Sequence, residues 1–67
     1  MFKKKRTIDI IMPNYNKGQF IVEAINSVIK QTYKNWRLFI IDDNSTDESK
    51  KKLRKYEKKK KIKIFYL

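Results

Sequence analysis

The chain has 67 residues and a formal net charge of +11, from 18 lysines and arginines against seven acidic residues. This length allows one small domain, and the absence of Cys and His removes disulfides and the usual zinc ligands as means of stabilising it. The longest interior apolar run, 38–41, is far shorter than the roughly 20 residues of a membrane span. We therefore expect an oligomer or a part of something larger.

The chain starts with a basic segment, 1–6, which we expect to be flexible. Asp9 interrupts the apolar stretch that follows, so the start lacks the hydrophobic core of a signal peptide. A chain without cysteine is compatible with the cytoplasm. We predict a cytoplasmic protein on these grounds.

Three segments follow in the first two thirds of the chain. Residues 7–12 are rich in β-branched side chains and are followed by Pro13, which predicts a strand that stops there. Apolar residues then recur at helical spacing, which predicts an amphipathic helix over 18–31. Residues 36–41 are nearly continuously apolar, a pattern typical of a parallel strand covered on both faces.

A second helix is predicted from a capping-box pattern. Ser45 is followed three residues later by Glu48, so we expect the helix to begin there, with the serine as its cap. The helix is predicted to run to about Tyr56 or Lys58, with Leu53 and Tyr56 facing inward.

The last segment, 61–67, alternates and then becomes apolar, which predicts a third strand. The order strand–helix–strand–helix–strand is βαβαβ, half of a doubly wound α/β sheet, and right-handed crossovers place the parallel strands in the order 3-2-1. The first strand then lies at an open edge. We interpret the chain as the truncated N-terminal half of a larger α/β domain.

The predicted core comes from the first helix and the second strand: Ile21, Ile25, Val28, Ile29 and Phe39.

Polar residues follow the first two strands, at 13–16 (PNYN) and 42–45 (DDNS). Ligands of open α/β sheets bind beyond the carboxyl ends of the strands, and neighbouring strands bring these two clusters together. A tyrosine ring, two amides and a carboxylate are suited to holding a nucleoside. Adjacent strand residues point to opposite faces, so at most one of Asp42 and Asp43 faces the cleft and the other anchors the loop. The single glycine excludes a P-loop and a G-x-G-x-x-G turn.

Three motifs together resemble the start of the family-two glycosyltransferases. They are IDIIMPNYN at 8–16, AINSV at 24–28 leading to QTY at 31–33, and LFIIDDNSTD at 38–47. These enzymes invert the sugar configuration, have a Rossmann-like GT-A fold and use nucleotide-diphosphate sugars. The resemblance implies that 1–67 is the nucleotide-binding N-terminal part of such a domain. It implies transfer of a sugar, from a UDP-linked donor, to an acceptor hydroxyl in bacterial surface glycan synthesis.

The resemblance also implies roles for five residues. In such enzymes the backbone at Pro13 and the ring of Tyr15 lie against the base, usually uracil. Asp43, the second aspartate of the pair, hydrogen-bonds the base. Asp42 matches the structural first aspartate, and Asn16 matches an amide that fixes the loop. From the residues alone, the alternatives are a loop aromatic that covers the sheet for Tyr15 and a turn residue near a helix cap for Asp43.

Two features separate this chain from the full family pattern. Many members have Glu where Lys17 stands. The family's metal-binding D-x-D, which takes Mg²⁺ or Mn²⁺, and its catalytic base lie further along than Leu67. We therefore predict no catalytic residue and no metal ligand in this chain, and no activity of the chain alone. A missing C-terminal half or a homo-oligomer is expected to cover the open sheet edge.

Lysine and arginine gather in three runs, 3–6, 50–52 and 58–61. A solvated surface is the favoured interpretation, and no specific nucleic acid is expected. Attraction to an anionic membrane surface, with peripheral binding at its inner face, is a further hypothesis. The alternative function is a small basic nucleic-acid-binding module, whose binding would depend steeply on salt. A third reading is a gene product that does not fold stably.

Overall fold

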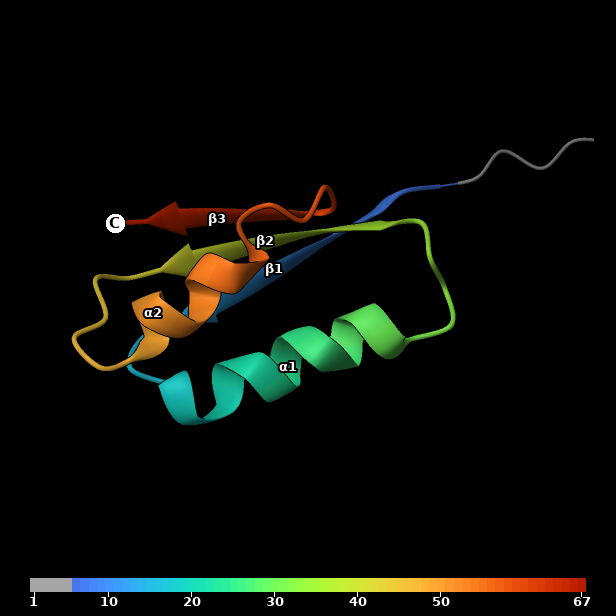
Figure 1. The fold of residues 1–67 in the computed structure, drawn as a ribbon. Coiled ribbons are helices and arrows are strands. Elements are labelled where there is room, and N and C mark those ends of the chain that lie inside the picture. Colours follow the sequence, from blue (N-terminus) through green and yellow to red (C-terminus); the bar gives the residue numbers. More distant parts are fainter. Residues whose placement is uncertain (1–5) are drawn as a thin grey trace, which may run out of the picture.

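The chain folds as βαβαβ, as the sequence predicts. A computed structural model describes residues 6–67; residues 1–5, which hold most of the predicted flexible basic segment, lie outside the described residues. The elements are β1 (Ile8–Asn14), α1 (Gly18–Lys30), β2 (Trp36–Asp42), α2 (Ser49–Leu53), the 3-10 turn η1 (Arg54–Tyr56) and β3 (Ile62–Tyr66) (Figure 1). None of the helices in this part of the chain is long and apolar enough to cross a membrane.

The three strands form one parallel sheet in the order β1-β2-β3, which confirms the predicted order and the edge position of β1. Ile10 lies opposite Leu38, and Leu38 lies opposite Ile62. Both helices cover the same face of this sheet, and all three strands end on the left of Figure 1. The loops after β1 and β2 therefore meet at one end of the sheet.

The core lies between the helices and this covered face. Side chains two residues apart on β2 point toward the helices, and Leu38 and Ile40 are completely buried there. Ile21 and Ile25 of α1 and Leu53 of α2 pack against them. The inward-facing side chains of the second helix thus lie where the apolar spacing predicts.

The opposite face of the sheet is not covered by any of residues 6–67, which corrects the prediction that β2 is buried on both sides. Phe39 lies on this face and is only half-buried, stacked on Phe65 with 6.5 Å between ring centroids. Ile11 on β1 is 59% exposed. Apolar composition shows that a strand face is suited to burial, but it does not show what covers that face.

β1 continues through Pro13 to Asn14, two residues beyond the predicted end. The Ile8 N–H donates to the Asn35 carbonyl, and the Asn14 carbonyl accepts from Asp43 N–H, so even-numbered residues of β1 bond to β2. Pro13 therefore faces the open edge, where its missing N–H removes no bond of the ladder.

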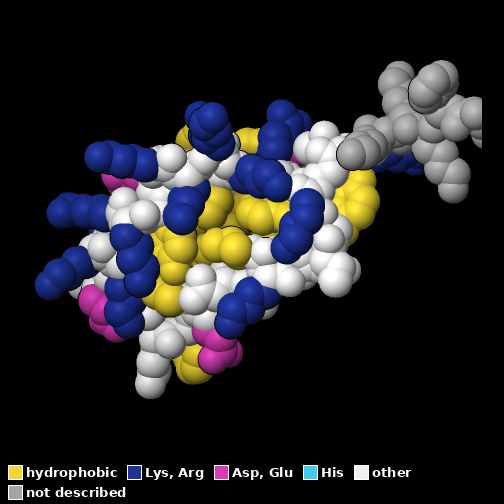
Figure 2. All heavy atoms as spheres, turned by 45° about the vertical axis from the view of Figure 1, so that its right-hand side comes forward, with side chains coloured by type: hydrophobic (Ala, Val, Ile, Leu, Met, Phe, Trp, Pro, Cys, Tyr) yellow, Lys and Arg dark blue, Asp and Glu magenta, His cyan; other side chains and the backbone are white. Residues whose placement is uncertain are grey.

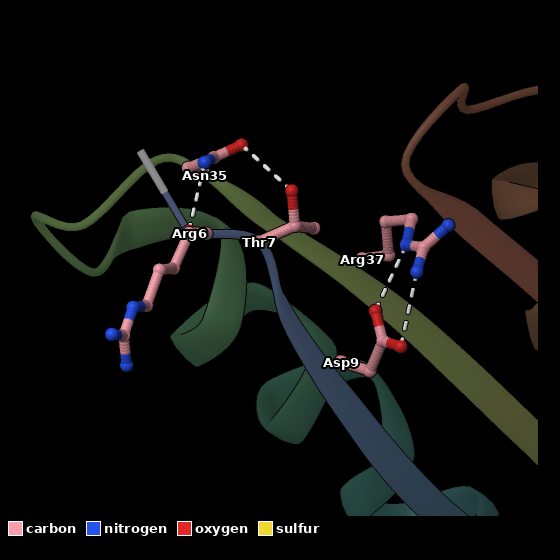
Figure 3. Close-up of polar contacts among 5 residues, drawn as sticks. All are labelled: Arg6, Thr7, Asp9, Asn35 and Arg37. Carbon is pink, nitrogen blue, oxygen red and sulfur yellow. Dashed lines mark hydrogen bonds and ion pairs between the residues drawn. The ribbon is translucent and has the colours of Figure 1, made fainter. Parts of the chain in front are cut away.

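Hydrogen bonds connect the start of β1 to the loop before β2 (Figure 3). Asn35 donates its side-chain N–H to the Arg6 carbonyl at 2.8 Å. Asp9 and Arg37 lie opposite each other in the register and form a two-pronged ion pair at 2.8 and 3.0 Å. Both side chains are about half exposed, so we expect the pair to contribute less than about 1 kcal/mol.

The second helix begins at Ser49, three residues later than a helix capped by Ser45 would begin. Its N-cap is Glu48, whose side chain makes no capping hydrogen bond, whereas Asp47 Oδ1 accepts from the Ser49 backbone N–H at 2.9 Å. Ser45 is buried and bonds instead to residues of the two loops, as described below. The helical turns end at Tyr56, the earlier of the two predicted ends.

Candidate functional site

The two predicted polar clusters meet at the carboxyl end of the sheet, around an open hollow of about 500 Å³. The hollow lies toward the uncovered face. It is lined by residues from the ends of all three strands: Pro13, Asn14, Tyr15, Lys17, Ile41, Asp43 and Leu67.

Asp42 is completely buried beside this hollow and accepts three hydrogen bonds. Asn14 donates its side-chain N–H to Asp42 Oδ1 at 2.8 Å, and the Ser45 hydroxyl donates to the same oxygen at 2.7 Å. The Ser45 backbone N–H donates to Oδ2 at 3.0 Å. Burial alone would raise the pKa of Asp42, but these bonds outweigh it and hold the pKa of this carboxyl below its usual value. Asp42 is therefore an ionised anchor for the loop that follows β2.

Asn16 joins the two loops. Its backbone N–H donates to the Ser45 hydroxyl oxygen at 2.9 Å, and its side-chain oxygen accepts from the backbone N–H groups of Thr46 and Asp47 at 2.7 and 3.1 Å. Its φ of 50° lies in the left-handed region, which Asn adopts more readily than most residues. The loop after β1 is thus held to the loop after β2 at residue 16.

Gly18, the first residue of α1, allows a further close contact between the loops. Its N–H donates to Asp47 Oδ2 at 2.9 Å. A Cβ at this position would lie 3.0 Å from carboxylate atoms of Asp47 and Glu48, so a larger residue here would require these side chains to shift by a few tenths of an ångström. Lys52 donates to the Gly18 carbonyl at 2.8 Å, which ties α2 to the start of α1.

Asp43 and Tyr15 are exposed, unlike the buried Asp42 and Ser45. Asp43 is exposed and lines the hollow, whereas its neighbour Asp42 points to the covered side of the sheet. The Tyr15 ring is 57% exposed, and Pro13 beside it is exposed as well. An exposed carboxylate accepts hydrogen bonds from N–H or O–H groups, and an exposed ring offers a face for stacking.

Sequence reasoning missed part of this arrangement. Asn14 and Ser45 complete the buried network, and the Ser45 pattern pointed to a helix cap instead. Within residues 6–67 the buried Asn14 Oδ1 has no hydrogen-bond partner. Lys17 and Leu67 also line the hollow. The sequence signal for Leu67 was its place directly after the third parallel strand, because the carboxyl ends of parallel strands lie at the same end of the sheet.

Among residues 6–67 there is no group of three or more acidic, histidine or cysteine side chains placed to hold a metal ion. Asp42 is fully committed to Asn14 and Ser45, which leaves Asp43 as a single carboxylate in the hollow. The residues present do not make a metal site.

Comparison with known proteins identifies the family. The sequence model described as "Glycosyl transferase family 2" matches residues 9–67. The Escherichia coli UDP-Glc:alpha-D-GlcNAc-diphosphoundecaprenol beta-1,3-glucosyltransferase WfgD is 48% identical over 46 residues, 69% of this chain and 18% of WfgD. TuaG of Bacillus subtilis (strain 168), whose name refers to teichuronic acid biosynthesis, is 36% identical over 64 residues, 94% of this chain and 25% of TuaG.

A third relative is WcaA of Escherichia coli (strain K12), whose name refers to colanic acid biosynthesis. It is 46% identical over 44 residues, 66% of this chain and 16% of WcaA. The parallel βαβαβ sheet matches the N-terminal part of a Rossmann-like GT-A domain. The chain belongs to glycosyl transferase family 2, and it spans a quarter or less of the length of these three relatives.

Proposed function

We propose that the hollow at the carboxyl end of the sheet binds the nucleoside part of a UDP-linked sugar donor. Tyr15 and the backbone at Pro13 lie against the uracil ring, and Asp43 accepts a hydrogen bond from the N–H of the base. Lys17 at the rim is placed to attract the diphosphate. The observation that carries this proposal is the contrast between two adjacent carboxylates. Asp42 is buried and anchors the loop, whereas Asp43 is exposed in the hollow.

In the complete enzyme, the reaction we propose is an in-line displacement at the anomeric carbon of the sugar. The acceptor oxygen forms the new bond, the bond from carbon to the diphosphate oxygen breaks, and the nucleotide diphosphate leaves with the electron pair. A carboxylate base takes the acceptor proton. We propose that this base and the carboxylates for a Mg²⁺ or Mn²⁺ ion come from residues outside these 67, so the chain alone transfers no sugar.

The names of the relatives indicate in which biosynthetic processes those proteins act. WfgD, TuaG and WcaA are named for lipid-linked or polysaccharide acceptors and pathways. We propose synthesis of a bacterial surface glycan at the cytoplasmic side of the membrane. The open β1 edge and the uncovered sheet face are proposed to be closed by the rest of the domain or by a second copy of the chain.

Calorimetric titration of the 67-residue chain with uridine tests the site. Uridine carries no phosphate, so the +11 charge of the chain does not attract it non-specifically. We expect Asp43→Ala and Tyr15→Ala each to weaken binding about tenfold, because each removes a charged hydrogen bond or a stacking contact.

Matched controls use the same residue types elsewhere. Glu23 is an exposed acid on α1, and Tyr33 is an exposed tyrosine at the other end of the sheet. We expect Glu23→Ala and Tyr33→Ala to bind uridine as the unaltered chain does. Equal affinities of Asp43→Ala and the unaltered chain would show that the site is assigned wrongly.

A further inference from the structure

A second hollow lies at the opposite end of the sheet, near the amino ends of β2 and β3. Its volume is about 270 Å³, and its floor is apolar, formed by Ile29, Trp36 and Ile62. Four lysines surround this floor: Lys34, Lys59, Lys60 and Lys61. We call this feature the lysine-rimmed pocket. Figure 2, which brings the right-hand side of Figure 1 forward, shows hydrophobic side chains exposed among Lys and Arg side chains.

The lysines of the rim fall into two pairs. Lys34 donates to the Ile29 carbonyl at the end of α1, and the ammonium of Lys61 lies 4.9 Å from the centre of the Trp36 ring. Lys59 and Lys60 are exposed, and their ammonium groups make no hydrogen bond or ion pair within residues 6–67. The rim therefore presents at least two ammonium groups to an external anion.

The acidic residues are distributed unevenly along the strand direction. No acidic residue lines the lysine-rimmed pocket or the adjoining hollow of Tyr33, Lys34, Asn35 and Lys61. Four of the seven acidic residues lie instead at the end of β2 and in the segment that follows it, at the nucleotide end: Asp42, Asp43, Asp47 and Glu48. Asp9 near the start of β1 is paired with Arg37, and Glu57 accepts a hydrogen bond from the Tyr66 hydroxyl, so neither forms an ion pair with the rim lysines.

We propose that the lysine-rimmed pocket docks the protein on an anionic lipid bilayer. Lysine side chains place their apolar stems against an apolar surface and their ammonium groups among headgroups. Each such lysine strengthens binding to an anionic leaflet, and the exposed Tyr33 of the adjoining hollow is of a residue type that favours the interface. A nucleic acid fits less well, because the Trp36 ring is 5% exposed under Lys61 and offers no face for a base. Docking at this end leaves the nucleotide hollow facing away from the bilayer.

Vesicle co-sedimentation of the 67-residue chain tests this surface. The vesicles are phosphatidylcholine with or without phosphatidylglycerol, and the variant is Lys59→Gln with Lys60→Gln. We expect its partition onto the anionic vesicles to fall about 30-fold, because two headgroup contacts are lost. The control, Lys51→Gln with Lys63→Gln, removes the same charge from α2 and the uncovered sheet face, and we expect a loss of about threefold or less.

Two further measurements separate docking from general attraction. Trp36 is the only tryptophan, so lipids brominated near the headgroup should quench its fluorescence, whereas a Trp36→Phe chain carrying Tyr15→Trp should be quenched far less. Equal losses for the two double variants, or equal quenching at both ends, would show that net charge alone drives binding. An equal loss of duplex DNA binding by Lys59→Gln with Lys60→Gln would identify a polyanion site and overturn the lipid assignment. None of these readouts depends on the nucleotide site.

Discussion

Asp42 and Asp43 are neighbours in the chain but have opposite environments. Strand alternation alone predicts that they point to different sides, and the structure buries the first while it leaves the second exposed. The meeting of the clusters at 13–16 and 42–45 was predictable, but the hydrogen-bond partners of Asp42 within them were not. Asn14 lies 28 residues away in the sequence, and only the folded sheet brings it within 2.8 Å.

Replacing Asp42 with Asn should destabilise the chain by about 2–3 kcal/mol, because a buried charged acceptor of three hydrogen bonds is lost. Asp43→Asn, at an exposed position, should change stability by less than about 0.5 kcal/mol. Urea denaturation followed by circular dichroism measures both. Equal effects would contradict the division into anchor and contact residue.

The Asp42→Asn effect should also depend on pH. The pKa of Asp42 is lowered in the fold from its ordinary 3.8, so its ionised form stabilises the fold fully above that pH. The stabilisation is lost as the pH falls through the lowered pKa. The stability difference between the unaltered chain and Asp42→Asn should therefore be largest near neutral pH and shrink in strong acid.

Among the elements, the strands and α1 followed their apolar patterns closely, whereas the start of α2 did not. The capping box at Ser45 is a local signal, and a local cap competes with any tertiary partner for the same hydroxyl. Here the hydroxyl donates to Asp42 and accepts from Asn16, so the helix begins at Ser49. The end of β1 was misplaced for a related reason, because the cost of Pro13 depends on whether its edge is paired.

The two faces of the sheet should respond differently to the same truncation. Ile25 is completely buried between α1 and the covered face, so Ile25→Ala should cost about 3 kcal/mol. Ile11 on the uncovered face is 59% exposed, and Ile11→Ala should cost less than about 1 kcal/mol. Both are read from urea midpoints of the chain. Similar costs would mean that the uncovered face is buried in solution.

For the whole molecule, the topology was predictable because alternating strands and helices with right-handed crossovers leave few arrangements of three parallel strands. The meeting of the loops after β1 and β2 followed from that topology. The distribution of charge did not, since three lysine runs in a sequence do not show which end of the sheet they reach. The amino ends of β2 and β3 are basic, whereas the carboxyl end of the sheet holds most of the carboxylates.

Uridine binding by this chain should not require a divalent metal. The hollow contains one carboxylate, Asp43, and residues 6–67 include no cluster of three metal-binding side chains. We expect the same affinity for uridine in EDTA and in excess Mg²⁺ or Mn²⁺, measured by calorimetry. A requirement for metal would place an ion in the hollow and would give Asp43 a different role.

The open edge of β1 has a consequence for how a complete domain forms its ligand crevice. A further parallel strand added beside β1 would reverse the strand order at that point, and its carboxyl end would lie next to Tyr15. In doubly wound sheets, the crevice at such a reversal is where ligands bind. The hollow described here is then one wall of a two-walled crevice. Under the proposed function, these 67 residues would select the base, and the added wall would govern what is attached to it.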